Sequence, residues 1–208
     1  MVFYKEYRRV DKKVEILSRE IVHQGFYPKT VIRLKHRRFD GGMSEEISRD
    51  ILEQGGAAVV LPYDPVSGRV LLIEQFRPAP LMMGDDPWML EAVAGRTEDG
   101  EDPAATAGRE MVEEAGIEAS ALVRAGIGYP SPGCLKEVAT VYVGRCDLGR
   151  YQPGTHGLAD EHEDIRTLVV TVDEALAMAA AGTLRSLPAL VALYWLALNR
   201  ASLWREPA

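Results

Sequence analysis

The sequence predicts an α/β protein with a mixed central sheet, flanking helices and an additional antiparallel sheet at the N-terminus. Three observations predict this class. Two continuous apolar runs, 55–64 and 69–77, are typical of strands that are covered on both faces. Residues 31–39 alternate apolar and basic side chains, as in a half-exposed strand. A stretch with helix caps at both ends occupies 102–116.

The N-terminal part of the chain has the pattern of short strands. Residues 31–39 and 45–54 both alternate apolar and polar side chains, and the turn sequence FDGGM (39–43) lies between them. This order favours a small antiparallel sheet. We therefore expect two domains, an N-terminal β-sheet over 1–55 and a main domain over 56–208.

The apolar runs of the main domain predict its central strands. Residues 55–64 and 69–77 are joined through PYDPVSG, whose Pro, Asp and Gly residues are typical of a hairpin turn. WMLEAVAG (88–95) predicts one further short strand, and EVATVYVGR (137–145) predicts another.

Three helices follow from their end signals. Asp102 and Pro103 are typical of an N-cap and a first helical position, and Gly116 is placed for a left-handed C-terminal cap. Thr171 and Glu174 form a capping box for a second helix that reaches about residue 181. The last helix carries an apolar stripe of Leu187, Leu190, Val191, Tyr194 and Leu198.

Composition excludes several classes of protein. The 208 residues, 47% hydrophobic and 26% charged, are sufficient for one well-buried core. A net charge of −7 argues against a nucleic-acid or anionic-membrane binder. Two cysteines imply no disulfide framework. Without a signal-peptide pattern or an apolar run of membrane-spanning length, we expect a cytoplasmic protein.

Three carboxylates are crowded on one predicted helix. Glu110 and Glu114 are four residues apart and Glu113 lies beside them, so they repel one another unless a cation compensates. A hard divalent cation such as Mg²⁺ prefers these oxygen ligands and usually shares them with phosphate. The preceding loop, Gly95 to Gly100, can turn a backbone carbonyl towards the same place. The alternative is a solvated acidic helix face.

The spacing around these carboxylates is more specific than their number. Arg109 can pair with an acidic residue such as Glu101 and fix the loop to the helix. The segment fits G-x5-E-x7-R-E-U-x-E-E-x-G-U, where U is apolar, and a chance match occurs at roughly one in a billion start positions. The matching residues are Gly95, Glu101, Arg109, Glu110, Met111, Glu113, Glu114, Gly116 and Ile117. This pattern is the Nudix box, and the segment resembles the Nudix hydrolases.

That resemblance implies an α/β/α sandwich that binds divalent metal and cleaves a nucleoside diphosphate linked to another group. By position, the metal ligands are Glu110, Glu114 and the Ala94 carbonyl, and Glu113 binds metal directly or through a neighbour and takes part in catalysis. The implied cofactor is Mg²⁺, with Mn²⁺ as an alternative.

Further stretches resemble the bacterial ADP-ribose pyrophosphatases, from about Val14 to Trp195. They include GFYPKTVIRLKHRRFDGGMS, VLLIEQFR, PWMLEAVAG, SPGCLKE and HGLADEHEDIR. This resemblance implies a homodimer that exchanges its N-terminal sheets. It also implies the substrate-binding residues: Phe26 on the adenine, Arg49 from the same N-terminal element, Arg77 at the diphosphate and Glu137 near the terminal ribose.

An acidic, glycine-containing segment, HGLADEHEDIR (156–166), has the composition of a mobile loop. A phosphoryl-transfer hydrolase needs a group that positions or deprotonates the attacking water. By the resemblance, Glu161 is that base, and Glu163 orients it or contacts metal. His156 and His162 are alternatives, although loop histidines more often make local hydrogen bonds.

The sequence thus predicts Mg²⁺-dependent hydrolysis of ADP-ribose to AMP and ribose 5-phosphate. One alternative is the same chemistry on another nucleotide sugar, such as GDP-mannose. Another is a non-catalytic Nudix domain that senses a nucleotide, although a sensor has no need of all three carboxylates.

Overall fold

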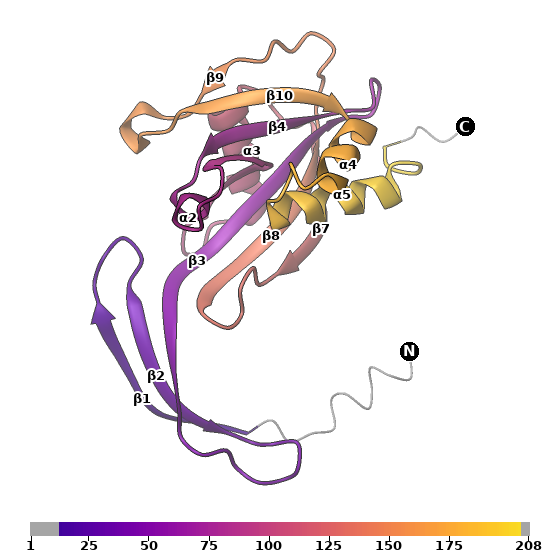
Figure 1. Ribbon diagram of the computed structural model, residues 1–208. Coiled ribbons are helices and arrows are strands. Elements are labelled where there is room, and N and C mark those ends of the chain that lie inside the picture. Colours follow the sequence, from indigo (N-terminus) through magenta and orange to yellow (C-terminus); the bar gives the residue numbers. More distant parts are fainter. Residues whose placement is uncertain (1–12, 205–208) are drawn as a thin grey trace. The chain divides into compact units, whose positions relative to one another are not determined.

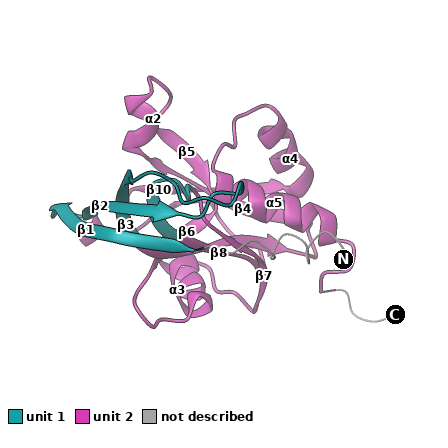
Figure 2. Ribbon diagram, turned by 90° about the horizontal axis from the view of Figure 1, so that it is seen from below, with its two compact units in different colours: residues 1–54, 131–137 teal, residues 55–130, 138–208 magenta. Residues whose placement is uncertain are grey.

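The computed structural model describes residues 13–204, which belong to two compact units. Unit 1 is Met1–Gln54 with Ser131–Glu137, and unit 2 is Gly55–Pro130 with Val138–Ala208 (Figure 2). The strands are β1 (Val14–His23), β2 (Lys29–His36), β3 (Ile47–Asp64), β4 (Arg69–Phe76), β5 (Trp88–Glu91), β6 (Val93–Thr97), β7 (Ala121–Gly128), β8 (Leu135–Arg145), β9 (Thr155–His156) and β10 (Ile165–Thr171). The helices are α2 (Pro78–Met82), α3 (Pro103–Ala115), α4 (Val172–Ala180) and α5 (Leu187–Asn199), with a 3₁₀ turn at Ala159–Glu161.

Unit 1 is built on an antiparallel sheet. β1 pairs with β2 from Val14 opposite His36 to His23 opposite Lys29, and β2 pairs with the first part of β3 (Figure 1). The antiparallel N-terminal sheet expected from the sequence is therefore confirmed. Every residue of β1 is exposed in the isolated chain.

β3 is a single strand of 18 residues, whereas the sequence suggested two strands, over 45–54 and 55–64. Gly55, with φ of 95°, adopts a left-handed backbone conformation within it. The adjacent Gly55 and Gly56 favoured a break between two strands, but glycine tolerates this backbone conformation inside a strand.

In unit 2, alternate residues of β3 enter two separate apolar clusters. Val59 and Leu61 pack with residues of α4 and α5, while Ala58 and Val60 pack with residues of α3. Successive side chains of a strand point to opposite faces, so the sheet is covered on both sides. Figure 2 shows α3 on one side of these strands and α4 and α5 on the other. The expected α/β/α layering is confirmed.

The segment 88–95 forms two strands rather than the single strand expected. β5 pairs with β4, and β6 pairs with β3, so the chain changes neighbours at Ala92. β4 pairs on its other edge with β10. This arrangement places the end of β6 directly before the loop that leads into α3.

The buried face of α5 also differs from the expectation. Four residues of the predicted stripe are 48–85% exposed: Leu187, Val191, Tyr194 and Leu198. The buried residues are Ala189, Ala192, Leu193 and Leu196. The helix is apolar on nearly all sides, so periodicity did not identify its inner face, and the small alanines allow the closer approach to the sheet.

In the described part of the chain, no helix is long and apolar enough to cross a membrane.

Candidate functional site

Helix α3 presents the carboxylates, and its ends are fixed by the residues expected from the sequence. The Asp102 side chain accepts a hydrogen bond from the Ala104 N–H at 3.0 Å, and Pro103 begins the helix. Gly116 caps the C-terminus with φ of 61°, in the left-handed region. These caps place the helix directly after the loop that follows β6.

Glu110 and Glu114 are buried between α3 and β6, with 8% and 2% of their surface exposed. The Glu114 carboxylate accepts a hydrogen bond of 2.9 Å from the backbone N–H of Ala94. Glu110 lies over Gly95, where an added Cβ would be 1.8 Å from Oε1. Glycine is required at this position because the carboxylate occupies the space of a side chain.

Burial makes these carboxylates hard to ionise. It raises the pKa of Glu114 to about 8. The hydrogen bond from the Ala94 N–H favours the charged form and opposes this shift. Burial also raises the pKa of Glu110, where the Arg109 guanidinium opposes the shift and Glu113 adds to it. A cluster of this kind favours a nearby cation, because a positive charge offsets both desolvation and mutual repulsion.

Arg109 pairs within the helix rather than with Glu101, so that expectation is wrong. Its Nη2 lies 2.7 Å from Oε1 of Glu110, and its Nη1 donates to Oε2 of Glu113 at 2.5 Å. Glu113 is one helical turn from Arg109, so this ion pair forms within α3 and does not span the loop. Glu101 instead accepts a hydrogen bond from the Glu98 N–H at 3.0 Å, which closes the loop before α3.

The donors on α3 fit a hard divalent cation. They are carboxylate oxygens, and Glu110 lies against Gly95 in space that a Cβ at this glycine would occupy. Within residues 13–204, no three Asp, Glu, His or Cys side chains are close enough together to form a metal site on their own. Arg109 draws Glu113 aside and the Ala94 N–H holds Glu114, so the assignment of Ala94, Glu110, Glu113 and Glu114 as ligands stays a prediction.

The acidic loop brings Glu163 into electrostatic range of this cluster. The negative charge of Glu163 contributes to the raised pKa values of both Glu110 and Glu114, after burial and closer groups. Its carboxylate accepts a hydrogen bond of 3.1 Å from the Leu158 N–H. Glu161 ends the 3₁₀ turn and is exposed. The charge of Glu163 therefore acts on both buried carboxylates of the box.

Arg77 is held at the end of β4. Its Nε and Nη2 donate to Oε2 of Glu91 at 3.0 and 2.8 Å, and Gln75 donates to the same oxygen at 3.2 Å. The positive charge of Arg77 lowers the pKa of Glu114 slightly, against the larger effect of burial. Arg77 therefore lies within electrostatic range of Glu114 on α3.

The other predicted substrate-binding residues lie in unit 1. Phe26 is 78% exposed, and its ring meets Tyr27 edge-to-face at 4.7 Å. Arg49 on β3 is exposed, and its Nη1 donates to the Ser48 carbonyl at 2.8 Å. Glu137 is half-buried, and burial raises its pKa.

Glu53 holds the two chain segments of unit 1 together. Its Oε1 accepts hydrogen bonds from Arg19 and Thr30, each at 2.5 Å. Its Oε2 accepts from Lys136 at 2.9 Å. These donors, Thr30 first, lower the pKa of Glu53 to about 2. The carboxylate thereby attaches Ser131–Glu137, which carries Glu137, to the strand that carries Arg49.

Glu53 and Glu91 were not predicted from the sequence. Each is a charged residue next to or inside a largely apolar strand. A charge in such a position indicates a paired carboxylate, and this was the available signal in the sequence. Tyr151 and Thr167, which bond to each other at 3.1 Å, gave no such signal because their roles depend on contacts distant in sequence.

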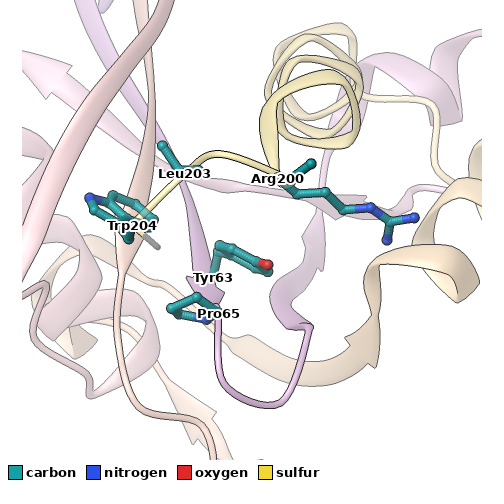
Figure 3. Close-up of a pocket in the computed structure, with 6 residues that line it drawn as sticks. Tyr63, Pro65, Arg200, Leu203 and Trp204 are labelled. Carbon is teal, nitrogen blue, oxygen red and sulfur yellow. The ribbon is translucent and has the colours of Figure 1, made fainter. Parts of the chain in front are cut away.

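A separate cavity of about 280 Å³ in unit 2 contains none of the predicted site residues (Figure 3). Tyr63 stacks with Trp204 there, with ring centroids 6.4 Å apart. The cavity is lined by Tyr63, Pro65, Arg200, Ala201, Leu203 and Trp204.

The chain is similar to several known proteins over most of its length. The chain is 42% identical to an ADP-ribose pyrophosphatase of Escherichia coli K12, over 93% of this chain and 92% of that protein. An ADP-ribose pyrophosphatase of Haemophilus influenzae is 37% identical, over 91% and 88%. A GDP-mannose pyrophosphatase of Cronobacter sakazakii is 28% identical, over 89% and 96%.

A solved structure described as an ADP compounds hydrolase has the same fold. It superposes with a TM-score of 0.67 at 17% identity and covers 89% of this chain and 93% of that one. The family model for the NUDIX domain matches residues 53–190, which include the whole loop–helix segment described above. The chain therefore belongs to the NUDIX family.

Proposed function

We propose that this protein hydrolyses the diphosphate of ADP-ribose, giving AMP and ribose 5-phosphate. The observation that carries the proposal is the grouping of Glu110 and Glu114 over the Ala94 and Gly95 backbone, with Glu163 in electrostatic range of both carboxylates and Arg77 in range of Glu114. The similarity to ADP-ribose pyrophosphatases over nearly the whole chain supports this choice of substrate.

The residues proposed to hold Mg²⁺, or alternatively Mn²⁺, are Glu110, Glu113, Glu114 and the carbonyl of Ala94. When bound, the cation supplies charge neutralisation at the diphosphate and increases the acidity of water. The ordered backbone at Ala94 and Gly95 keeps two of these carboxylates on one side of α3. Arg109 balances the charge of Glu110 and Glu113 through its two ion pairs.

The remaining chemistry is the attack of water on a phosphorus atom with cleavage of the bridging P–O bond. Glu161 accepts the proton of the attacking water, and Glu163 orients that carboxylate or the water. Arg77, fixed by Glu91, binds the diphosphate through its free N–H groups.

Unit 1 is proposed to recognise the two ends of the substrate. Phe26, with its exposed ring, stacks on the adenine, and Arg49 acts from β3, which pairs with β2. Glu137 binds the terminal ribose. The attachment of its segment through Glu53 and Lys136 supports a shared role for these residues.

We also propose a homodimer in which the N-terminal sheets are exchanged. The supporting observation is β1, which is exposed throughout and carries apolar residues, and exposed apolar strands favour association. Light scattering during gel filtration measures the mass. A monomer at micromolar concentration would refute this proposal. A cytoplasmic location stays a prediction from the sequence.

A substrate panel with Mg²⁺ tests the activity. We expect kcat/KM for ADP-ribose to exceed that for GDP-mannose, which is the substrate named for one of the relatives. A clear preference for GDP-mannose would overturn the substrate, and tight ADP-ribose binding without turnover would instead identify a sensor. Glu114→Gln provides the inactive reference, because it replaces an ionisable carboxyl group by an amide of the same shape, and we expect kcat to fall by orders of magnitude.

A further inference from the structure

The last turn of α3 is bound to the acidic loop through carbonyl groups that the helix itself cannot use. The final C=O groups of an α-helix have no partner within the helix. The Tyr151 hydroxyl donates to the Ala115 carbonyl at 2.7 Å, and the Gly157 N–H donates to the Glu113 carbonyl at 3.2 Å. Two of these carbonyls are thus satisfied by residues on either side of β9.

His156 completes this contact. Its ring lies so close to Gly116 that a Cβ there would be 2.7 Å from the ring. Its Nε2 lies 3.2 Å from the Tyr151 hydroxyl, and the two rings stack with centroids 6.5 Å apart. The glycine that caps α3 therefore has a second use, because it admits the imidazole against the helix end.

The protons of this network can be assigned by counting donors. Tyr151 has one hydroxyl proton, and the Ala115 carbonyl can only accept, so that proton belongs to their 2.7 Å bond. The contact with His156 then requires Nε2 to donate to the tyrosine oxygen. The Thr167 Oγ1 lies 3.1 Å from the same oxygen and accepts from the Gly154 N–H at 2.9 Å; its single proton is available to the tyrosine oxygen or to the Gly154 carbonyl at 3.2 Å.

The loop continues from this contact to Glu163. Leu158 donates its N–H to the Glu163 carboxylate at 3.1 Å, and the Glu163 N–H donates back to the Leu158 carbonyl at 3.2 Å. A Cβ on Gly157 would be 2.7 Å from that of Glu163. A displacement of residues 156–158 would therefore move Glu163 relative to α3.

We propose that Tyr151 and His156 are positioning residues, which hold the acidic loop against the end of α3 and so fix Glu163 relative to Glu110 and Glu114. The inference rests on the proposed function, since it assigns the loop a part in the same hydrolysis. It adds two residues that touch neither substrate nor the reacting atoms.

Two measurements need no substrate. Tyr151→Phe removes the hydroxyl and keeps the ring, and we expect amide hydrogen exchange across residues 154–163 to accelerate by about tenfold, as for one lost hydrogen bond. In alkaline buffer, where imidazole is neutral, ¹⁵N spectra should show His156 protonated on Nε2. Unchanged exchange, or a proton on Nδ1, would overturn the anchor.

Kinetics test the positioning role. We expect Tyr151→Phe to lower kcat about tenfold and to leave KM for ADP-ribose within about twofold, since positioning affects the transition state more than binding. His156→Gln keeps a donor near the position of Nε2 and should retain more activity than His156→Leu. Tyr142→Phe removes a hydroxyl from the α3 side of the sheet and should leave kcat and loop exchange unchanged.

The outcomes separate this inference from the proposed function. Faster loop exchange with unchanged kcat would overturn the positioning role, as would a fall in kcat that follows a lower melting temperature in every variant. If the wild type turned over no nucleoside diphosphate, the proposed function would fail, while the exchange and ¹⁵N data would still decide whether the anchor exists.

Discussion

The Glu110 carboxylate lies directly against the α-carbon of Gly95, so that an added Cβ would be 1.8 Å from Oε1. Real Cβ atoms do not approach other atoms this closely. The glycine is therefore required by a side chain on α3, although its own backbone belongs to the regular pairing of β6 with β3.

Gly95→Ala should displace Glu110 and lower kcat by about a hundredfold or more, because small misplacements of a catalytic group have effects of this size. The measurement is steady-state kinetics with a melting curve. Wild-type turnover would show that the position of Glu110 is unimportant. Gly108→Ala, where an added Cβ on α3 meets nothing within 4 Å, is the control. It should keep full activity and gain about 0.5–1 kcal/mol of stability, as alanine does in a helix.

Glu91→Gln should raise KM for ADP-ribose several-fold and change kcat less. The carboxylate holds Arg77 through two N–H groups, and a neutral amide weakens these charge-assisted bonds. Glu74→Gln, which removes the partner of Arg166 on the adjacent part of β4, is the control and should leave KM unchanged. If both variants behaved alike, Arg77 would not depend on Glu91.

Glu161→Gln and Glu163→Gln distinguish the two candidate bases. If Glu161 takes the proton, its variant should lose orders of magnitude in kcat with little change in KM, and Glu163→Gln should lose less. The structure gives Glu163 the closer electrostatic relation to the α3 carboxylates. An equal or greater loss for Glu163→Gln alone would transfer the base assignment to that residue.

Glu53→Gln should destabilise the protein by about 1–3 kcal/mol near neutral pH, since it weakens three hydrogen bonds to a charged group. The folded pKa of about 2 lies below the ordinary 4.5, so the contribution is complete above pH 4.5 and is lost as the pH falls towards 2. Denaturant titrations across this range measure it. In contrast, Glu46→Gln, which affects an exposed pair with Arg33, should change stability by less than about 1 kcal/mol. Equal effects of the two variants at every pH would contradict the role of Glu53.

The fold was predictable wherever local rules act alone. The ends of α3 followed from Asp102, Pro103 and Gly116, and the capping box of α4 formed as expected from Thr171 and Glu174. The inner face of α5 was not predictable, because a helix that is apolar all round has no periodicity that identifies one side.

The candidate site was predictable in its residues but not in its contacts. The spacing of Glu110, Glu113 and Glu114 identified the motif, and the motif identified the family. The predicted pairing of Arg109 with Glu101 was wrong, because sequence spacing did not favour Glu113, one helical turn away, over an acid across the loop. The contact between Tyr151 and Ala115 joins residues 36 positions apart, and no local pattern encodes it.

The continuity of β3 across both compact units limits how this chain can be divided. Unit 1 also includes Ser131–Glu137, so one cut after residue 54 cannot release it whole. A deletion of the first 54 residues would retain Ser131–Glu137 but remove the strand to which Leu52 and Glu53 attach this segment. An exchange at a single junction after residue 54 therefore transfers the first segment of unit 1 without Ser131–Glu137. A transfer that keeps Phe26, Arg49 and Glu137 together needs two exchanged segments.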